Sequence, residues 1–242
     1  MAVIGAALCG ALFAFQRSLI YFPQPRSNQT ASNLVALETP AGKALVSVRP
    51  SSAPGALIYF GGNAEDVSQA MPEFAAAFPD RAIYLLHYPG YGGSPGTPSE
   101  KVIFSQSLAL YDQVRTEHDN IIVIGRSLGS GVAVHLASLR PVARLVLVTP
   151  YNSLQEIASQ HYPYFPVRWL LRDKFESWKY APQVTAPTRI IVAAHDEIIP
   201  RASSERLRTH FKDGIASYAV IPNVGHNNIS DSPDYLPLLK RQ

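Results

Sequence analysis

The stretch that decides the fold is IIVIGRSLGSGVAVHLAS, residues 121–138. It opens with a run of aliphatic residues, places Ser127 in the pattern G-x-S-x-G, and continues into residues typical of a helix. A side chain at either glycine would collide with the strand or helix that crosses there, while the serine tolerates a strained backbone that lifts its hydroxyl above the sheet. The pattern predicts that Ser127 is a nucleophile on a sharp strand-to-helix turn.

Strand-like and helix-like segments alternate along the rest of the chain. The expected strands are residues 34–38, 44–49, 56–60, 82–87, 120–124, 145–149, 189–193 and 217–221. The expected helices are residues 64–78, 99–117, 128–138, 202–211 and 234–241, the first two capped by Asn63 and Ser99. Several strands are continuous aliphatic runs, which suit a parallel sheet buried on both faces. We therefore expect an α/β fold: a mostly parallel eight-stranded sheet, helices on both faces, and a site at the carboxyl ends of the strands.

The domain is expected to span residues 34–242, with a helical insertion at about 151–187 that interrupts the alternation. This insertion is rich in aromatic residues, and we expect it to lie over the strand ends. Substrate contacts are expected from Tyr151, Phe165 and Trp169. The alternative is that these residues belong to ordinary core or surface helices.

The composition excludes several classes of protein. Hydrophobic residues make up 47% of the chain and charged residues 16%, which is typical of a packed globular domain. The net charge is +3, and the lysines and arginines are scattered, so nucleic-acid binding is not expected. A single cysteine, Cys9, excludes an intrachain disulfide and a cysteine-based zinc site. We expect no metal or other cofactor, and the sequence does not indicate an oligomeric state.

The N-terminal segment, residues 1–22, is apolar and has no charged side chain before Arg17. Its uninterrupted apolar part, residues 2–15, would be roughly 21 Å long as a helix, shorter than a bilayer core of about 30 Å. Counting on to residue 22 makes it long enough if Arg17 reaches the membrane interface. We therefore expect a retained single-pass membrane anchor, followed by a linker over residues 23–33.

Other interpretations of this segment are a cleaved signal peptide, a lipoprotein site at Cys9 and a buried first helix. No basic residue opens the segment and no convincing cleavage site follows it, while Leu8 stands where a lipoprotein would have a small residue. Basic residues come only after the segment, at Arg17 and Arg26, which favours a domain on the cytoplasmic side of the membrane.

A serine nucleophile needs a histidine base and an orienting carboxylate, which follow it in the order acid and then histidine in this kind of fold. Of the seven histidines, His226 both follows Ser127 and comes directly after a late strand. The acid is expected at Asp196, where RIIVAAHDEIIP ends a strand. Glu197 is the second candidate and Asp173 a distant third.

An oxyanion hole completes the expected site. One donor should be the backbone N–H of Leu128, at the start of the helix after the nucleophile. The other should be the backbone N–H of Asn63 in YFGGNAED, where Gly61 and Gly62 let the backbone approach the substrate closely. An ordinary strand-to-helix turn capped by asparagine would have a similar sequence.

With these motifs in order, the chain resembles the α/β-hydrolase superfamily. It is more closely similar to the group that contains membrane-associated serine hydrolases and eukaryotic depalmitoylating α/β-hydrolase-domain proteins. The resemblance covers roughly residues 17–235 and implies the same roles for Ser127, Asp196, His226, Asn63 and Leu128. The motifs that carry it are RSLIYFPQP, YFGGNAED, PGYGGSPGTPSE, GRSLGSGVA, YPYFPVRWLLRDKF, HDEIIP and GHNN.

The chain departs from this group at two positions. Relatives usually have histidine where Gly61 stands, and often aspartate where His87 stands. The first change is expected to affect the oxyanion loop and the second the pocket.

These observations predict a serine hydrolase that cleaves a carboxylic ester or thioester, with a small-molecule or lipid-like substrate carrying a hydrophobic acyl group. A serine peptidase using the same three residues is the nearest alternative. A non-catalytic, hydrolase-like binding module is another. Dehalogenase and epoxide hydrolase chemistry is disfavoured because those relatives have aspartate where Ser127 stands.

Overall fold

The computed structural model describes residues 2–27 and 33–241. Within these residues the chain forms an eight-stranded sheet in the order β1-β2-β4-β3-β5-β6-β7-β8. The strands are β1 (Asn33–Leu37), β2 (Ala44–Arg49), β3 (Gly55–Phe60), β4 (Arg81–His87), β5 (Asn120–Arg126), β6 (Arg144–Val148), β7 (Thr188–Ala193) and β8 (Ala216–Ile221). β2 is antiparallel to both of its neighbours and the remaining pairs are parallel. The expected fold class is confirmed.

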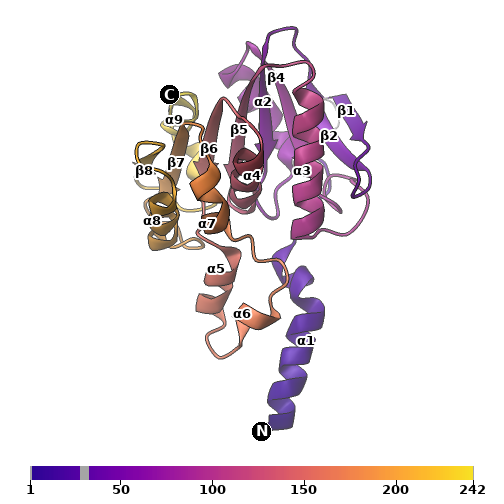
Figure 1. Cartoon of the computed structure of the whole chain (residues 1–242), viewed down its shortest axis with the longest axis vertical. Helices are drawn as coiled ribbons and strands as arrows, with labels where there is room; N and C mark the ends of the chain where they lie inside the picture. The colour runs from indigo at the N-terminus through magenta and orange to yellow at the C-terminus, as the bar shows by residue number, and fades with distance from the viewer. Residues whose placement is uncertain (1, 28–32, 242) are drawn as a thin grey trace.

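Helices cover both faces of the sheet (Figure 1). Along β3, Ile58 and Phe60 point into one apolar core, and Leu57 and Tyr59 into the other, so the strand is buried on both sides. The helices on the first face are α3 (Glu100–Val114), α4 (Leu128–Leu139) and α8 (Arg201–His210). Those on the second are η1 (Val67–Ala70), α2 (Met71–Ala77) and α9 (Tyr235–Lys240).

Of the two predicted helix N-caps, Ser99 is confirmed and Asn63 is wrong. The Ser99 hydroxyl accepts a hydrogen bond from the backbone N–H of Val102 and caps α3, as expected. The helix expected over residues 64–78 instead divides into η1 and α2, and the carboxylate of Asp66, not Asn63, caps η1. The side chain of Asn63 has other partners, described below.

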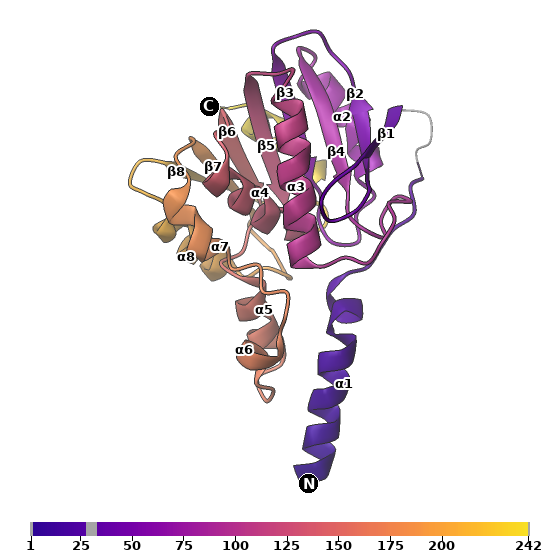
Figure 2. The same ribbon diagram turned by 45° about the vertical axis from the view of Figure 1, so that its right-hand side comes forward.

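The expected insertion, between β6 and β7, contains α5 (Leu154–His161), α6 (Val167–Leu170), α7 (Ser177–Tyr180) and η2 (Ala181–Gln183). α5 and α6 extend beyond the carboxyl ends of the parallel strands, on the same side of the molecule as α1 (Ala2–Ile20) (Figure 2). Part of the expected linker, residues 28–32, lies outside the described residues.

The prediction of a membrane-spanning anchor is wrong. α1 has 19 residues, and no helix of the described ranges, 2–27 and 33–241, is long and apolar enough to cross a membrane. The prediction required Arg17 to reach a membrane interface, but its Nε donates to Oδ2 of Asp173 at 3.0 Å. Gln16, next to it, is 7% exposed and is hydrogen-bonded to the insertion. The polar last turn of α1 therefore docks on the domain, and the expected membrane location is corrected with it.

Candidate active site

Ser127 occupies the sharp turn between β5 and α4, with φ 48° and ψ −117°. This left-handed backbone is unfavourable for a residue with a side chain, so the packing around the turn must hold it in place. A Cβ at Gly125 would collide with the carbonyl oxygen of Gly129 and with Ala133, and a Cβ at Gly129 with the carbonyl oxygen of Phe60. The two glycines therefore let α4 cross the ends of β3 and β5 closely.

The structure brings Ser127, His226 and Asp196 together in one hydrogen-bonded chain. Nε2 of His226 lies 2.9 Å from Oγ of Ser127, and Nδ1 lies 2.9 and 3.0 Å from the two carboxylate oxygens of Asp196. The His226 and Asp196 side chains are 6% and 3% exposed. This arrangement can move the serine proton to the imidazole while the carboxylate holds the ring in orientation.

Loops after β7 and β8 hold the acid and the base. Oδ1 of Asp196 accepts the backbone N–H groups of Ile198 and Ile199, at 3.0 and 2.7 Å. Oε2 of Glu197, the second candidate for the acid, instead accepts the backbone N–H of His226 at 3.1 Å. Glu197 therefore fixes the loop that carries the base, whereas Asp196 contacts the imidazole itself.

Arg126 connects the serine turn to the histidine loop. Its guanidinium donates to the backbone carbonyls of His226 and Asn227, at 3.3 and 3.2 Å, and forms an ion pair with Glu65. Glu65 in turn accepts the Tyr59 hydroxyl at 2.6 Å. Burial and the neighbouring carboxylate raise the pKa of Tyr59 well above its usual range, so its hydroxyl stays protonated and donates.

The oxyanion loop follows β3 and approaches the serine closely, since a Cβ at Gly62 would lie 3.5 Å from Cβ of Ser127. The N–H of Gly62 donates to Oε2 of Glu65 at 2.6 Å, so this amide is already paired. Within the described ranges, the backbone N–H groups of Asn63 and Leu128 donate to no protein acceptor. These two amides are therefore free to bind an oxygen of a substrate.

The side chain of Asn63 fastens this loop to the N-terminal segment. Its Nδ2 donates to the backbone carbonyl of Ile20 at 2.5 Å, and its Oδ1 accepts from the backbone N–H of Phe22 and the hydroxyl of Tyr91, at 3.0 and 2.7 Å. The next residue, Ala64, has a φ of 56°. A residue in this strained region needs its surroundings to hold it, and the Asn63 side chain supplies three such contacts.

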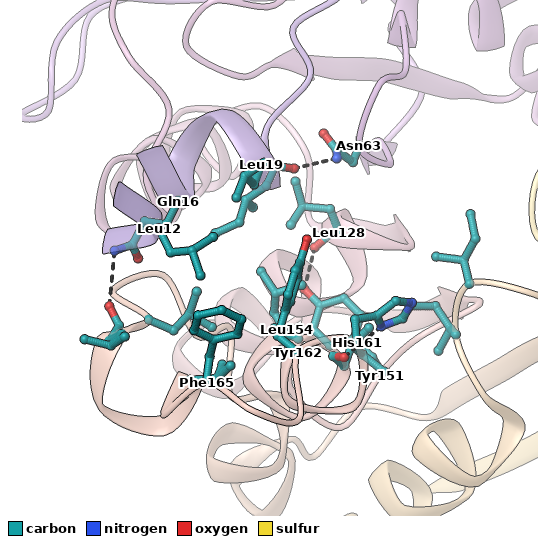
Figure 3. Close-up of a pocket in the computed structure, with 18 of the residues that line it drawn as sticks. Leu12, Gln16, Leu19, Asn63, Leu128, Tyr151, Leu154, His161, Tyr162 and Phe165 are labelled. Carbon is teal, nitrogen blue, oxygen red and sulfur yellow. Dashed lines mark hydrogen bonds between the residues drawn. The ribbon is translucent and has the colours of Figure 1, made fainter. Parts of the chain in front are cut away.

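An apolar pocket of about 330 Å³ opens beside the serine (Figure 3). Ser127, Leu128 and Asn63 line it together with side chains from α1, α5 and the segment around α6. Its volume is within the usual range for small-molecule sites. Of the residues that line it within the described chain, none is acidic.

The residues expected to contact substrate are only partly in this pocket. Tyr151 and Phe165 line it, and the Tyr151 hydroxyl donates to the carbonyl of Leu128 at 3.1 Å. Trp169 does not line it and is 80% exposed. Gly62 does not line it either. The indole of Trp169 is exposed and the Gly62 amide is held by Glu65, and the substrate contacts expected from these two residues stay predictions.

Three other residues named in the sequence analysis lie outside the pocket. Asp173, the third candidate for the acid, is buried and paired with Arg17. His87 does not line the pocket; it is buried against Gly92, with Nε2 2.9 Å from the hydroxyl of Ser47. At Gly61 a Cβ would collide with Val67, so the loop in this conformation has no room there for a larger side chain.

A mostly parallel eight-stranded sheet with a serine on the turn after its fifth strand is the architecture of α/β hydrolases. Comparison with protein families gives the same result. The model of the alpha/beta hydrolase fold family matches residues 55–177, and the chain belongs to this family. The family and fold support a hydrolase.

Relatives at the sequence level include an uncharacterized protein of Mycobacterium tuberculosis, 35% identical over 94% of this chain and 86% of its own length. Alpha/beta hydrolase domain-containing protein 17C of Xenopus laevis is 32% identical over 76% of this chain and 60% of its own length. Among solved structures, an esterase of Pyrococcus furiosus has a TM-score of 0.70 at 16% identity, covering 91% of this chain and 99% of that one. Est1E of Butyrivibrio proteoclasticus, solved with ferulic acid bound, has a TM-score of 0.69 at 16% identity, covering 85% and 94%. The two structures share the fold of this chain.

Sequence reasoning missed several residues that hold the site. The roles of Arg126, Glu65 and Glu197 depend on contacts between loops far apart in the sequence, and no local pattern predicts them. A signal was available for the last turn of α1, where Gln16 and Arg17 interrupt an apolar segment. Polar side chains need hydrogen-bond partners where an apolar helix packs on a domain, so these two residues are consistent with a docked helix end.

Proposed function

We propose that this protein is a serine hydrolase that cleaves carboxylic esters or thioesters with a hydrophobic acyl group. The observation that carries the proposal is the hydrogen-bonded chain of Ser127, His226 and Asp196 at an apolar pocket. The esterases among the structural neighbours share this fold, and esterase chemistry is carried to this chain here as part of the proposal.

The reaction proceeds through two acyl transfers. Nε2 of His226 takes the proton of the Ser127 hydroxyl as Oγ attacks the carbonyl carbon of the ester or thioester. The imidazolium, stabilised by Asp196, then gives this proton to the departing alcohol or thiol, and the acyl group stays on Oγ. Water next gives a proton to His226 and attacks the acyl-enzyme, which releases the carboxylic acid and returns the proton to Oγ.

The oxyanion formed in each step points toward the backbone N–H groups of Asn63 and Leu128. These amides belong to a fastened loop and to the first residue of α4, so little reorganisation is needed as the charge develops. The positive end of the α4 dipole adds to the stabilisation. Removing one such donor typically lowers kcat by about 10²–10³-fold.

The pocket favours an acyl group over a peptide amine. A peptidase that removes N-terminal residues needs an anionic side chain to hold the substrate ammonium group, and the described residues that line the pocket include no aspartate or glutamate. The three side chains required for covalent chemistry are also present and hydrogen-bonded, which disfavours a binding module without activity.

The test is labelling with a fluorophosphonate probe, followed by turnover of p-nitrophenyl esters and aminoacyl anilides. We expect labelling of the wild type and of the control Ser138→Ala on the same helix, and none of Ser127→Ala. We expect turnover of esters and not of anilides. Equal labelling of Ser127→Ala and wild type would refute the proposal, and turnover of anilides alone would replace it with a peptidase.

A further inference from the structure

The first helix lies outside the strand–helix alternation, yet it forms one side of the pocket. Leu12, Gln16, Leu19 and Ile20 line the pocket from α1, and Phe165, Leu170 and other residues line it from the insertion. Figure 3 shows Leu12 and Gln16 across from Phe165. The two sides of the pocket therefore come from segments about 150 residues apart in the sequence, which the hydrogen bond between Gln16 and Leu170 connects.

The end of α1 and Tyr21, which follows it, are fixed to two parts of the domain: the insertion and the oxyanion loop. The Gln16 amide donates to the carbonyl of Leu170 at 3.1 Å and accepts the N–H of Arg172 at 2.7 Å. Arg17 and the Tyr21 hydroxyl both donate to the carboxylate of Asp173, at 3.0 and 3.2 Å. The third contact joins Ile20 to the oxyanion loop. These bonds place α1 against the insertion and pair the amide of Gln16, a polar side chain that lines the pocket.

The residues of α1 that line the pocket lie at increasing distances from Ser127 along the helix axis. Ile20 is bonded to Asn63 at the end of the pocket that contains Ser127, and Leu12 lies two turns earlier in the helix, about 12 Å along its axis. A ligand that extends from Ser127 along this wall passes Leu19 and Gln16 before it reaches Leu12. The Gln16 amide and the Tyr151 hydroxyl, two polar groups that line the pocket, are already paired with protein atoms.

We propose that α1 is the wall that sets acyl-chain selectivity, and that Leu12 is a specificity-determining residue at the far end of the acyl pocket. This inference rests on the proposed ester or thioester hydrolysis at Ser127. Short acyl groups occupy the pocket near Ser127 and do not contact Leu12, whereas long ones pack against it. A larger side chain at this position therefore excludes long chains selectively.

The test compares Leu12→Trp with the wild type on p-nitrophenyl acetate, butyrate, octanoate and dodecanoate. We expect the ratio of kcat/KM for the long esters to kcat/KM for the acetate to fall, because KM for the long esters rises by about tenfold for each two methylenes excluded. Phe15→Trp is the matched control, because Phe15 is on the same helix, is 66% exposed and does not line the pocket. An unchanged chain-length profile in Leu12→Trp, or the same change in Phe15→Trp, would overturn the inference.

A binding measurement separates this inference from the proposed function. Calorimetric titration of dodecanoate into Ser127→Ala protein, with and without Leu12→Trp, reports on the pocket without turnover. If Leu12→Trp weakens dodecanoate binding at least about tenfold and the wild type hydrolyses no ester, the role of α1 in acyl-chain binding is supported and the proposed function is rejected. If the wild type hydrolyses esters and both proteins bind dodecanoate equally, the proposed function is supported and the role of α1 in acyl-chain selectivity is rejected. The absence of both turnover and binding would reject both.

Discussion

Substitution of Asp173 by asparagine should release the N-terminal helix from the domain. The Asp173 side chain is 5% exposed, and its carboxylate accepts from both Arg17 and Tyr21. Burial and this carboxylate raise the pKa of Tyr21 well above its usual range, so the hydroxyl remains a donor at neutral pH. Asparagine keeps the shape of the side chain but removes the charge that both donors share.

The magnitude follows from the two contacts. The Arg17 side chain is 41% exposed, so its ion pair with Asp173 is screened by water and contributes at most about 1 kcal/mol. The buried hydrogen bond from Tyr21 changes from a charged to a neutral acceptor, which costs about 1 kcal/mol more. The sum is about 2 kcal/mol, which lowers the docking equilibrium of α1 about 30-fold.

Hydrogen exchange measured by mass spectrometry tests this value. The backbone N–H of Tyr21 donates to the carbonyl of Arg17 at 2.8 Å, and amides of this last turn exchange when the helix undocks and unwinds. We expect exchange there to become about 30-fold faster in Asp173→Asn. The matched control is Asp112→Asn, which removes an exposed carboxylate paired with Arg140 and should leave the turn unchanged.

Two results would refute this reasoning. Exchange in the last turn of α1 that changes by less than about twofold would show that Asp173 does not hold the helix. An equal acceleration in α3 would show that the substitution destabilises the whole domain instead. The variant Tyr21→Phe should give about half of the effect in free energy, because it removes one of the two donors and leaves the ion pair.

Three further outcomes are expected. In steady-state assays, Asp196→Asn should lower kcat for esters by about 10⁴-fold. Glu197→Gln should lower it far less, because only Asp196 contacts the imidazole. Burial lowers the pKa of His87 to about 4 from 6.5, so the unfolded chain takes up its proton first as the pH falls. The free energy of unfolding should therefore drop between pH 6.5 and 4, and in urea titrations His87→Gln should reduce that drop by about 3 kcal/mol. Gly129→Ala should lower the thermal unfolding midpoint and abolish fluorophosphonate labelling, because the new Cβ collides with the carbonyl oxygen of Phe60.

The sheet and the serine turn could be predicted from the sequence because they follow from local patterns. Each of the eight expected strands is present, with bounds that differ by at most two residues. The proximity of Ser127, Asp196 and His226 also followed, since the ends of neighbouring parallel strands meet at one edge of the sheet. Chain order and strand ends were sufficient for these residues.

The contacts that hold the site could not be predicted in the same way. Arg17 and Asp173 are separated by 156 positions, and Arg126 reaches the carbonyl of a residue 100 positions away. No periodicity connects such pairs, because they depend on how loops fold against one another. The membrane prediction failed for this reason: hydropathy measures the length and polarity of a segment, but not the buried partner that Arg17 finds in Asp173.

The most direct test of the central claim is the mass of the acyl-enzyme. Wild-type protein mixed with p-nitrophenyl octanoate and quenched in acid within the first turnovers should carry one octanoyl group on the peptide that contains Ser127. The protein Ser127→Ala should carry none and should hydrolyse no ester. Full hydrolysis by Ser127→Ala, or an octanoyl group on a different residue of the active wild type, would contradict the account.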